Sequence, residues 1–491
     1  MQRVRPAWAA AALVLLLVGF ALVRPVDHDE SQYVAAAVLA ARGLIPYRDF
    51  AYLQTPLQPL VLAPFAGGLG IWTYPGLRIV NALLGAVAVG ASFTAMRGAG
   101  VRPTRALACA ALFACCDVLL FSAGTARNDA LPAALYALAL PPILRTERGS
   151  GSRASAVLIG LLLAAAVATK ISYALPAAAY GVHALCVRRH RPGWVLLGAA
   201  PVAALVAATW TASPLGFVYG VLLFPATAPG DYYLAAGRAW KLTLWAKAID
   251  TIKFLALGPA LLALAYVGHR RRRPMLLDGL ILAGLLAALL PAPTWRQYLL
   301  PILPPLFVRL AQLWEAQPPG RGLRIAAVVF AAAGLAPSIE ALVLAGGGTP
   351  MGAAMRDGRA IGAALDATRA GGAVATFSPQ FVPAARRPID PRFAAGPFHF
   401  RGRGLLAPAD EASLKLVSRG TLVSAFAAQP PGAILIGGEG HRTSGDDGLD
   451  AILARWAVAH RWRTVPVRGT AFTLFVPRQR SRAALLPISE S

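Results

Sequence analysis

Apolar segments long enough to cross a lipid bilayer recur through the first 345 residues of this chain, and short arginine-rich turns separate them. A helix needs about 20 consecutive apolar residues to span the hydrocarbon core, and segments 8–23, 77–96 and 322–345 are close to that length. Because a bilayer offers no water, such a backbone must satisfy its own hydrogen bonds as a helix. The sequence therefore predicts an all-α polytopic membrane domain over residues 1–345.

The basic residues between these segments predict the side of the membrane that each turn faces. Cytoplasmic loops carry an excess of lysine and arginine, so we expect Arg3, Arg5 and the arginines of 270–273 to be cytoplasmic. About 11 spans follow, with the acidic loop 24–76 and the C-terminus outside. Their predicted ranges are 8–23, 77–96, 104–122, 129–144, 154–170, 171–187, 194–212, 248–268, 275–291, 297–314 and 322–345. The formal net charge of +25 lies largely in short turns, so it does not indicate nucleic-acid binding.

Residues 346–491 have the composition of a water-soluble domain. Charged residues become denser after a run of three glycines at 346–348. Short apolar runs at 373–377, 433–436 and 472–476, bounded by Gly, Pro and Ser, predict strands, and 451–460 reads as a helix between two of them. This pattern predicts a small extracytoplasmic α/β domain, to which we assign packing or acceptor docking.

Acidic side chains follow the first span in the run Asp27, His28, Asp29 and Glu30. Asp29, with Gln32 three residues later, resembles a helix-capping box, which accounts for one acid. It does not account for Asp27 and Glu30, and acids beside a membrane are costly to hold. We therefore predict Asp29 and Glu30 as catalytic carboxylates, and Asp29 could serve as a cap as well.

A second acid, Asp129, stands at the next outer turn directly after Arg127 and Asn128. Two carboxylates that face one water-filled cleft can divide the work of base and stabiliser, and Asp129 is expected on the same side as Asp29. The alternative is a helix cap beside a snorkelling arginine. Asp117, inside the third predicted span, would need a partner or a cavity and is a further candidate.

Basic side chains also gather on the predicted outer face. They are Lys170, Arg238, Lys241, Lys247, Lys253 and Arg296. A lipid phosphate would need such donors, whereas snorkelling at span ends is the alternative for each of them. Arg296 lies between Trp295 and Tyr298, aromatic residues that are common at a membrane interface.

Four motifs occur in a fixed order along the chain. They are Asp29-Glu30-x-x-Tyr33 after the first span, Tyr47-Arg48-Asp49-Phe50 followed by Pro56-Leu57, Asp129 in the second outer turn, and Gln297-Tyr298-x-x-Pro301. In order and sidedness they resemble the GT-C glycosyltransferases, and within them the group of protein O-mannosyltransferases and lipid A aminoarabinose transferases. The resemblance covers residues 1–345, and the C-terminal part is similar only as a variable periplasmic domain.

The resemblance implies an integral plasma-membrane enzyme that moves a hexose or pentose from a polyprenyl-phosphate donor to a lipid, glycan or protein acceptor. Transfer would occur on the extracytoplasmic face and invert the anomeric carbon. Asp29 would activate the acceptor hydroxyl and Asp129 would organise the site. Some relatives use a divalent metal, so Mg²⁺ or Mn²⁺ is a candidate cofactor that Asp27, Asp29 and Glu30 could hold. Gln54 stands where the lipid A branch often has a lysine, so aminoarabinose specificity is not implied.

These observations together predict one set of site residues. The catalytic candidates are Asp29, Glu30 and Asp129, and the substrate-binding candidates are Tyr33, Arg48, Arg127, Lys170, Lys247, Arg296 and Tyr298. The alternative function is a membrane transporter or lipid flippase that uses Asp117, Asp129 and Lys170 as a relay. A scaffold that displays the C-terminal domain is a third. Transporters usually contain internal repeats and broken helices, and the sequence shows no clear repeat.

Overall fold

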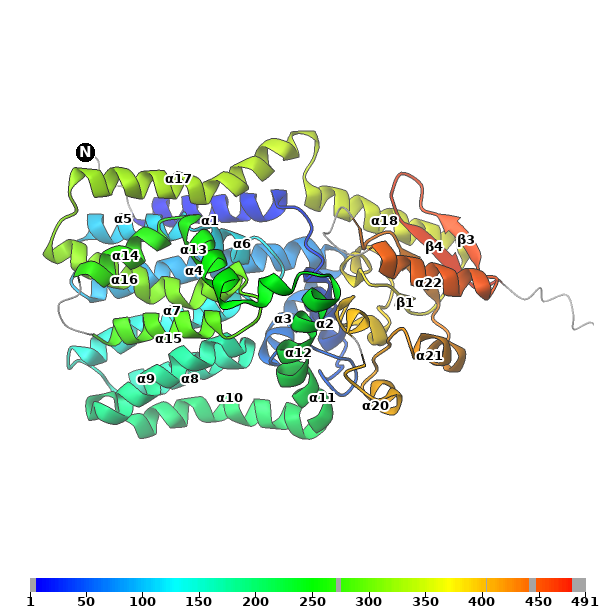
Figure 1. Cartoon of the computed structure of the whole chain (residues 1–491), viewed down its shortest axis with the longest axis horizontal. Helices are drawn as coiled ribbons and strands as arrows, with labels where there is room; N and C mark the ends of the chain where they lie inside the picture. The colour runs from blue at the N-terminus through cyan, green and yellow to red at the C-terminus, as the bar shows by residue number, and fades with distance from the viewer. Residues whose placement is uncertain (1–5, 271–274, 403, 441–446, 479–491) are drawn as a thin grey trace, which may run out of the picture.

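The computed structural model describes residues 6–270, 275–402, 404–440 and 447–478. A bundle of long helices forms one end of the molecule and a smaller region with a four-stranded sheet forms the other (Figure 1). The predicted combination of a helical part and a small C-terminal sheet is therefore confirmed. Arg3, Arg5 and the arginines at 271–273, on which the predicted orientation depended, lie outside the described residues.

The helices of the N-terminal part have the following bounds. They are α1 (Pro6–Val23), α2 (Glu30–Ala41), α3 (Leu57–Leu69), α4 (Thr73–Gly98), α5 (Pro103–Ala114), α6 (Asp117–Ala123), α7 (Ala130–Glu147), α8 (Arg153–Thr169), α9 (Ala174–Cys186), α10 (Pro192–Ala212), α11 (Pro214–Val218), α12 (Phe224–Ala235), α13 (Leu244–Ala256), α14 (Ala260–Arg270), α15 (Leu276–Leu289), α16 (Leu303–Ala316) and α17 (Arg321–Leu344).

Three stretches are long and apolar enough to cross a membrane by themselves. They are Leu57–Gly98, Pro192–Ala212 and Arg321–Gly347. Two further pairs, α5 with α6 and α13 with α14, would raise the count to five if each counts as one span. The predicted total of 11 spans stays a prediction, because several of the other apolar helices are shorter than a bilayer requires.

Two of the predicted spans, 104–122 and 248–268, each contain a break between two helices that the sequence did not predict. The axis turns by 68° between α5 and α6 and by 102° between α13 and α14. The two breaks contact each other, since the Asp117 amide donates to the Leu257 carbonyl at 2.9 Å. Gly258, at φ +133°, permits this approach, because an added Cβ would lie 2.7 Å from the Cys116 Cα atom. Apolar composition alone does not reveal such breaks, because the two helices of each pair together have the composition of an apolar span.

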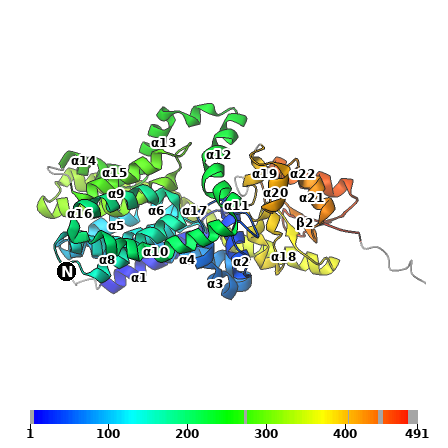
Figure 2. The ribbon, with the colours of Figure 1, turned by 90° about the horizontal axis from the view of Figure 1, so that it is seen from below.

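Helices α8 and α10 pack closely because two glycines face the opposite backbone. A Cβ atom added at Gly160 would lie 1.9 Å from the Val195 carbonyl oxygen, and one added at Gly198 would lie 1.9 Å from the Val157 carbonyl oxygen. Small residues at such positions let apolar helices approach each other within a bilayer. Segment 213–247, predicted as a loop, contains α11 and α12, and the arm from α12 to α13 stands out from the bundle (Figure 2).

The C-terminal part combines helices with one sheet. Its elements are α18 (Pro350–Thr368), β1 (Val374–Ala375), α19 (Phe398–Arg401), α20 (Pro408–Ser413), α21 (Leu422–Ala428), β2 (Ala433–Ile436), α22 (Asp447–Ala459), β3 (Arg463–Pro466) and β4 (Thr473–Val476). The strand order is β1-β2-β4-β3, with β1 and β2 parallel and the other pairs antiparallel. The sequence predicted β1, β2, β4 and α22 but not α18 or β3. The boundary predicted at residue 345 falls between α17 and α18.

The C-terminal part shares one hydrophobic core with helix α2. Tyr33 and Leu39 of α2 are buried in the same cluster as Ile361, Phe381 and Leu474 of the C-terminal part. Burial of apolar surface contributes roughly 25 cal/mol per Å², so this cluster holds the two parts together. The acidic segment that precedes α2 therefore lies at their junction.

A fully buried ion pair fixes the segments of the helical part that lie beside this junction. Both Glu30 and Arg78 have side chains that are 0% exposed, and the Arg78 Nη2 atom lies 2.5 Å from Glu30 Oε2. Glu30 also accepts hydrogen bonds from the Tyr74 hydroxyl at 2.6 Å, the Ala126 amide at 2.6 Å and the Asp27 amide at 3.0 Å. One carboxylate thus joins helix α4, the loop before α2 and the loop before α7.

The Arg78 guanidinium is satisfied at every donor. A guanidinium has five N–H groups, and Arg78 directs two of them to Glu30. The remaining three go to the carbonyl oxygens of Ala21 at 2.9 Å, Arg24 at 2.7 Å and Pro25 at 2.9 Å. The end of α1 is therefore held against α4, and the first residues of the loop after α1 are held in one conformation.

Replacing Arg78 should destabilise the whole junction. Breaking a buried pair from one side leaves an uncompensated charge and costs about 3–5 kcal/mol, so Arg78→Met should lower the free energy of unfolding by about that amount. The matched control is Arg102→Met, because Arg102 is 66% exposed in its pair with Glu315 and exposed pairs contribute little. Unfolding of the purified proteins in detergent measures the free energy of unfolding of both variants and of the parent protein. Equal losses in the two variants would contradict the assignment of Glu30–Arg78 as the organising pair.

Candidate active site

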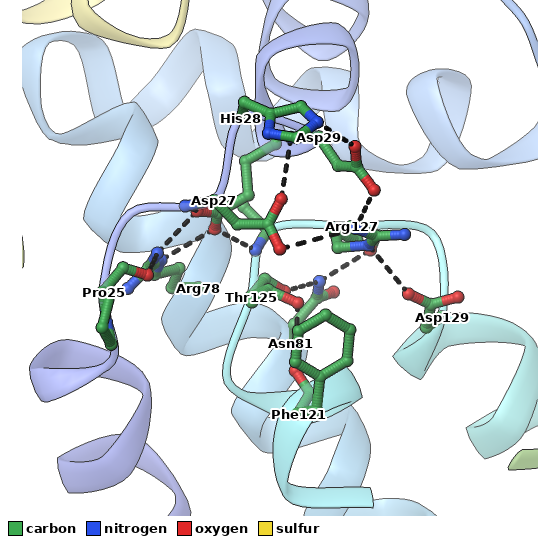
Figure 3. A network of polar contacts seen from close by, with 12 residues as sticks. Pro25, Asp27, His28, Asp29, Arg78, Asn81, Phe121, Thr125, Arg127 and Asp129 are labelled. Atoms are coloured by element: carbon green, nitrogen blue, oxygen red, sulfur yellow. Dashed lines mark hydrogen bonds and ion pairs between the residues drawn. The ribbon is translucent and has the colours of Figure 1, made fainter. Parts of the chain in front are cut away.

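The segment between α1 and α2 folds into a tight turn that presents its acids. The Asp27 carboxylate accepts the Asp29 amide at 2.8 Å, a side-chain-to-backbone bond typical of Asx turns. Asp29 occupies the N-cap position of α2, yet its side chain makes no capping hydrogen bond. The predicted capping box is therefore wrong. Asp29 instead contacts His28 Nε2 at 3.0 Å and forms an ion pair with Arg127 (Figure 3).

Arg127 lies between three carboxylates. Its Nη1 atom pairs with Asp29 and lies 3.6 Å from Asp27 Oδ2, while its Nε atom donates to Asp129 Oδ2 at 3.2 Å. The loop that carries Arg127 is held by Asn81 of α4, whose amide donates to the carbonyl oxygens of Thr125 at 2.6 Å and Arg127 at 2.7 Å. Figure 3 shows this arrangement. Asp29, Arg127 and Asp129, predicted from separate motifs, are thus brought together.

Asp129 is buried behind Arg127 and also pairs with Lys170. The Lys170 ammonium lies 5.2 Å from the centre of the Tyr298 ring, within the range of a cation–π contact. Asp129 is not among the described residues that line the cavity, whereas Arg127, Lys170 and Tyr298 are. Asp129 therefore acts on the site through the two cations that it positions.

A cavity of about 600 Å³ lies at the junction of the helical and C-terminal parts. Asp27 and Asp29 line it together with six cationic side chains. These are Arg24, Arg127, Lys170, Arg238, Arg296 and Arg401. Tyr33 faces the same space, and α12 contributes an apolar wall that includes Phe224 and Ala228. The cavity therefore combines two carboxylates with an excess of positive charge and one apolar wall.

Arg24 and Arg296 meet at the buried carboxylate of Asp117. Arg296 Nη1 lies 2.9 Å from Asp117 Oδ2, and Arg24 Nη2 lies 3.9 Å from Oδ1. The Phe121 ring lies between the cations, with guanidinium carbons at 4.3 Å for Arg296 and 5.4 Å for both Arg24 and Arg127. Asp117 thus has the partner that its position required. The Arg296 side chain remains 33% exposed and available to a ligand.

The C-terminal part supplies one wall of the cavity, which the sequence did not predict. Arg401 Nη1 lies 3.5 Å from His28 Nε2, and its Nη2 donates to Glu439 at 2.8 Å. The Phe398 ring lies 5.8 Å from the His28 ring. No motif singles out Arg401 or Phe398, because their role depends on how the C-terminal part packs on α2. Asp27 was predicted only as a member of the acidic run and a candidate metal ligand, and Arg24 was not singled out.

Besides Asp129, three predicted site residues do not line the cavity. Glu30 is fully buried against Arg78 and serves the fold. Arg48 is 51% exposed and pairs with its neighbour Asp49 at 2.8 Å. Lys247 donates to the carbonyl oxygens of residues 289 and 290 at 2.9 and 3.4 Å, where a cation stabilises the end of α15. A charge near a span end does not by itself indicate substrate binding.

The three ionisable side chains of this turn have pKa values that are shifted in different directions. Burial raises the pKa of Asp29, but the charge of Arg127 and the hydrogen bond from His28 outweigh it, so the pKa lies below the usual range. Burial and the neighbouring Asp29 raise the pKa of Asp27. Burial lowers the pKa of His28, yet the hydrogen bond and charge of Asp29 raise it above its ordinary value overall. Asp29 is therefore the ionised carboxylate of the pair.

Asp27, His28 and Asp29 have donor atoms within 4.8 Å of one another and could hold a divalent metal. Glu30, also predicted as a ligand, is committed to Arg78. Arg127 already supplies positive charge between the two aspartates. A metal at this place would have to displace Arg127, so these residues do not fit a resident metal well.

No protein-family model matches the chain. No curated protein matches it by sequence either. Its structure is similar to that of ArnT from Cupriavidus metallidurans bound to undecaprenyl phosphate, with a TM-score of 0.59, 15% identity, and coverage of 96% of this chain and 97% of that chain. It also resembles an oligosaccharyltransferase from Archaeoglobus fulgidus, with a TM-score of 0.46, 13% identity, and coverage of 78% of this chain and 64% of that one. The Saccharomyces cerevisiae Pmt1-Pmt2 protein O-mannosyltransferase gives a TM-score of 0.33 at 19% identity, over 49% of this chain and 35% of that one.

The similarity to ArnT extends over almost the entire chain, including the C-terminal part. The predicted GT-C fold is therefore confirmed. At 15% identity the similarity establishes the fold and leaves the chemistry to be argued from the site.

The stability difference between the parent protein and Asp29→Asn should be largest in mildly acidic solution. Because folding lowers the pKa of Asp29, its ionised form stabilises the fold above the ordinary pKa of about 3.9 and this contribution is lost below it. Because folding raises the pKa of His28, the protonated ring stabilises the fold below about 6.5 and this contribution is lost as the pH rises through the raised value. Thermal unfolding of both proteins across pH should show a difference in stability that is widest from about pH 4 to about pH 6.5. A difference that does not depend on pH would contradict the Asp29–His28 interaction.

Proposed function

We propose that this protein is a plasma-membrane glycosyltransferase that moves a sugar from a polyprenyl-phosphate donor to an acceptor hydroxyl on the extracytoplasmic face. The observation that carries this proposal is the junction cavity, in which an ionised carboxylate, Asp29, faces a space surrounded by cations. A lipid-phosphate leaving group requires the cations, and an attacking hydroxyl requires the carboxylate. The GT-C fold is consistent with both requirements.

The donor phosphate would bind to cations that line the cavity. Arg296 and Lys170 line one side of it, and arginine pairs with phosphate in a bidentate manner while lysine acts as a point charge. The apolar wall from α12 would face the first isoprene units. Outside the cytoplasm a lipid-linked sugar is the available activated donor, since nucleotide sugars remain inside. The transferred sugar would be a hexose or a pentose.

The reaction would proceed by a single displacement. Asp29 accepts the proton of the acceptor hydroxyl as that oxygen forms a bond to the anomeric carbon. The bond from the anomeric carbon to the phosphate oxygen breaks, and the polyprenyl phosphate leaves with its electrons. Attack opposite to the leaving group inverts the anomeric carbon. Arg127 holds Asp29 in its ionised form, and Asp129 positions Arg127 and Lys170.

The acceptor would enter at the side formed by the C-terminal part. Phe398 and Arg401 contact His28 there, and His28 contacts Asp29, so an aromatic surface and a cation lie near the base. An acceptor glycan, lipid or protein with an anionic or sugar-ring group near its hydroxyl would suit these contacts. The C-terminal domain would then lie outside the cytoplasm, with the N-terminus inside, as the arginine distribution predicts.

A transporter or flippase is the alternative, and the two broken helices favour it to some extent. The proposed relay residues do not form a path across the bundle. Asp117 pairs with Arg296, whereas Asp129 pairs with Lys170. Arg296 and Lys170 line the same cavity. A cluster at one cavity fits a reaction site better than a transmembrane relay.

Asp29→Asn should abolish most transfer while leaving the protein folded. The variant keeps the size of the side chain and an oxygen for Arg127 but loses the base, so the rate should fall by roughly 10²- to 10⁴-fold. The measurement is transfer from a synthetic polyprenyl-phosphate sugar by purified proteins. Arg48→Ala is the control and should transfer at near-parental rate, since Arg48 lies outside the cavity. A folded Asp29→Asn protein with near-parental transfer would remove Asp29 from the mechanism.

Lys170 and Lys247 allow a matched test of donor binding. Both are lysines of the outer face predicted to bind substrate, but Lys170 lines the cavity and Lys247 stabilises the end of α15. A charged hydrogen bond contributes about 1.5–3 kcal/mol, so Lys170→Met should weaken binding of undecaprenyl phosphate by about tenfold or more. Lys247→Met should leave the Kd unchanged. Equal effects of the two substitutions on the Kd would argue against the cavity as the phosphate site.

A further inference from the structure

A second group of ionisable side chains lies at the far end of the helical bundle from the junction cavity. Glu147 ends α7, His183 lies in the last turn of α9, and His190 lies in the 3₁₀ helix η3 (Arg188–His190). Figure 1 shows these helix ends on the side of the bundle away from the sheet. Neither the GT-C resemblance nor the proposed transfer reaction uses these residues.

Both imidazoles face the same carboxylate oxygen. His183 Nε2 lies 3.1 Å and His190 Nε2 lies 2.7 Å from Glu147 Oε2. The rings cross edge to face at 81° with centres 4.9 Å apart. One ligand atom from each residue falls within 4.8 Å of the others. Three donors from three separate elements thus converge on one point.

The two nitrogen–oxygen separations are close to those of a tetrahedral zinc site. With zinc–ligand bonds of about 2.0–2.1 Å, neighbouring donors on a tetrahedron lie roughly 3.3 Å apart. The two nitrogen–oxygen distances require only small outward shifts to reach that value. Two imidazoles and one carboxylate leave the fourth position to water, a donor set well known for zinc. Calcium and magnesium prefer oxygen donors and would not select two histidines.

The surrounding contacts orient the donors as a metal site requires. The Tyr180 hydroxyl lies 3.1 Å from His190 Nδ1, so the outer ring nitrogen has a partner and Nε2 is directed inward. Arg189 Nη2 donates to Glu147 Oε1 at 2.8 Å, which leaves Oε2 for the metal. Metal-bound histidines and carboxylates usually have such outer partners. The His190 ring is completely buried, and the other two side chains are partly exposed.

The position of Glu147 also favours a bound cation. Carboxylates at the C-terminal end of a helix face its negative end and are destabilising without compensation. Glu147 lies in the last turn of α7, the helix that begins directly after Asp129. A divalent ion would neutralise this charge and join α7, α9 and η3.

We propose that Glu147, His183 and His190 bind one Zn²⁺ ion as a structural clasp between α7, α9 and η3. The basic turn at 145–153 is predicted to be cytoplasmic, so the clasp would face the cytoplasm. This site is separate from the transfer reaction, and its presence does not depend on that proposal.

The test is the zinc content of the full-length protein purified in detergent. After removal of metal with a chelator and titration with Zn²⁺, mass spectrometry should detect one bound ion per chain, and thermal unfolding should shift to a higher temperature. Replacement by Co²⁺ should produce visible absorption of a tetrahedral site with nitrogen ligands. His183→Gln and Glu147→Gln should lose the ion and the thermal shift. Tyr180→Phe, which removes one outer partner, should weaken zinc affinity by about 10- to 100-fold.

Two controls locate the ion. His460→Gln changes a histidine of the C-terminal part whose Nδ1 atom lies 2.8 Å from the Trp456 carbonyl oxygen, and this variant should keep the full zinc content. His28→Gln probes the other group of donors within 4.8 Å and should also keep it. If the parent protein binds no zinc in the titration, the proposal is overturned. This result does not depend on whether the variants fold. Retention of zinc by both His183→Gln and Glu147→Gln would overturn it as well, and loss only in His28→Gln would place the metal in the cavity.

Discussion

The buried pair of Glu30 and Arg78 holds together the parts of the chain from which the cavity is built. Desolvating two charges is expensive, and only a complete set of hydrogen bonds can offset that cost. Arg78 uses all its donors and Glu30 accepts from three other groups besides. The end of α1, the turn before α2 and the loop before α7 therefore have one mutual arrangement. The residues that face the ligand space extend from these fixed segments.

Two acids adjacent in sequence accordingly have different tasks. Glu30 points into the protein and pairs permanently with Arg78, whereas Asp29 points to the cavity and pairs with Arg127 and His28. Arg127 is in turn held by Asp129, which also holds Lys170. A chain of alternating charges leads from the buried core to the cavity surface. Such preorganisation lets a site stabilise charge without rearranging at the moment of reaction.

The sequence predicted what depends on local pattern and missed what depends on packing. Apolar length located most helices, and the order of Asp29, Asp129 and Tyr298 indicated the GT-C fold. The sequence could not distinguish Glu30 from Asp29, because burial, not identity, separates their roles. The breaks at Cys116 and Gly258 depend on contacts between distant segments. Arg401 reaches the cavity only because the C-terminal part shares a core with α2.

The most direct test of the account compares cell-envelope glycans and lipid-linked sugars, by mass spectrometry, in cells with and without the gene. If the junction cavity transfers a sugar, one envelope glycan, lipid or protein should lack a single sugar in the deletion strain. The corresponding polyprenyl-phosphate sugar should accumulate, and the parental gene should restore both while a gene carrying Asp29→Asn should not. Unchanged envelope glycans together with altered solute or lipid transport would contradict the account and favour a transporter.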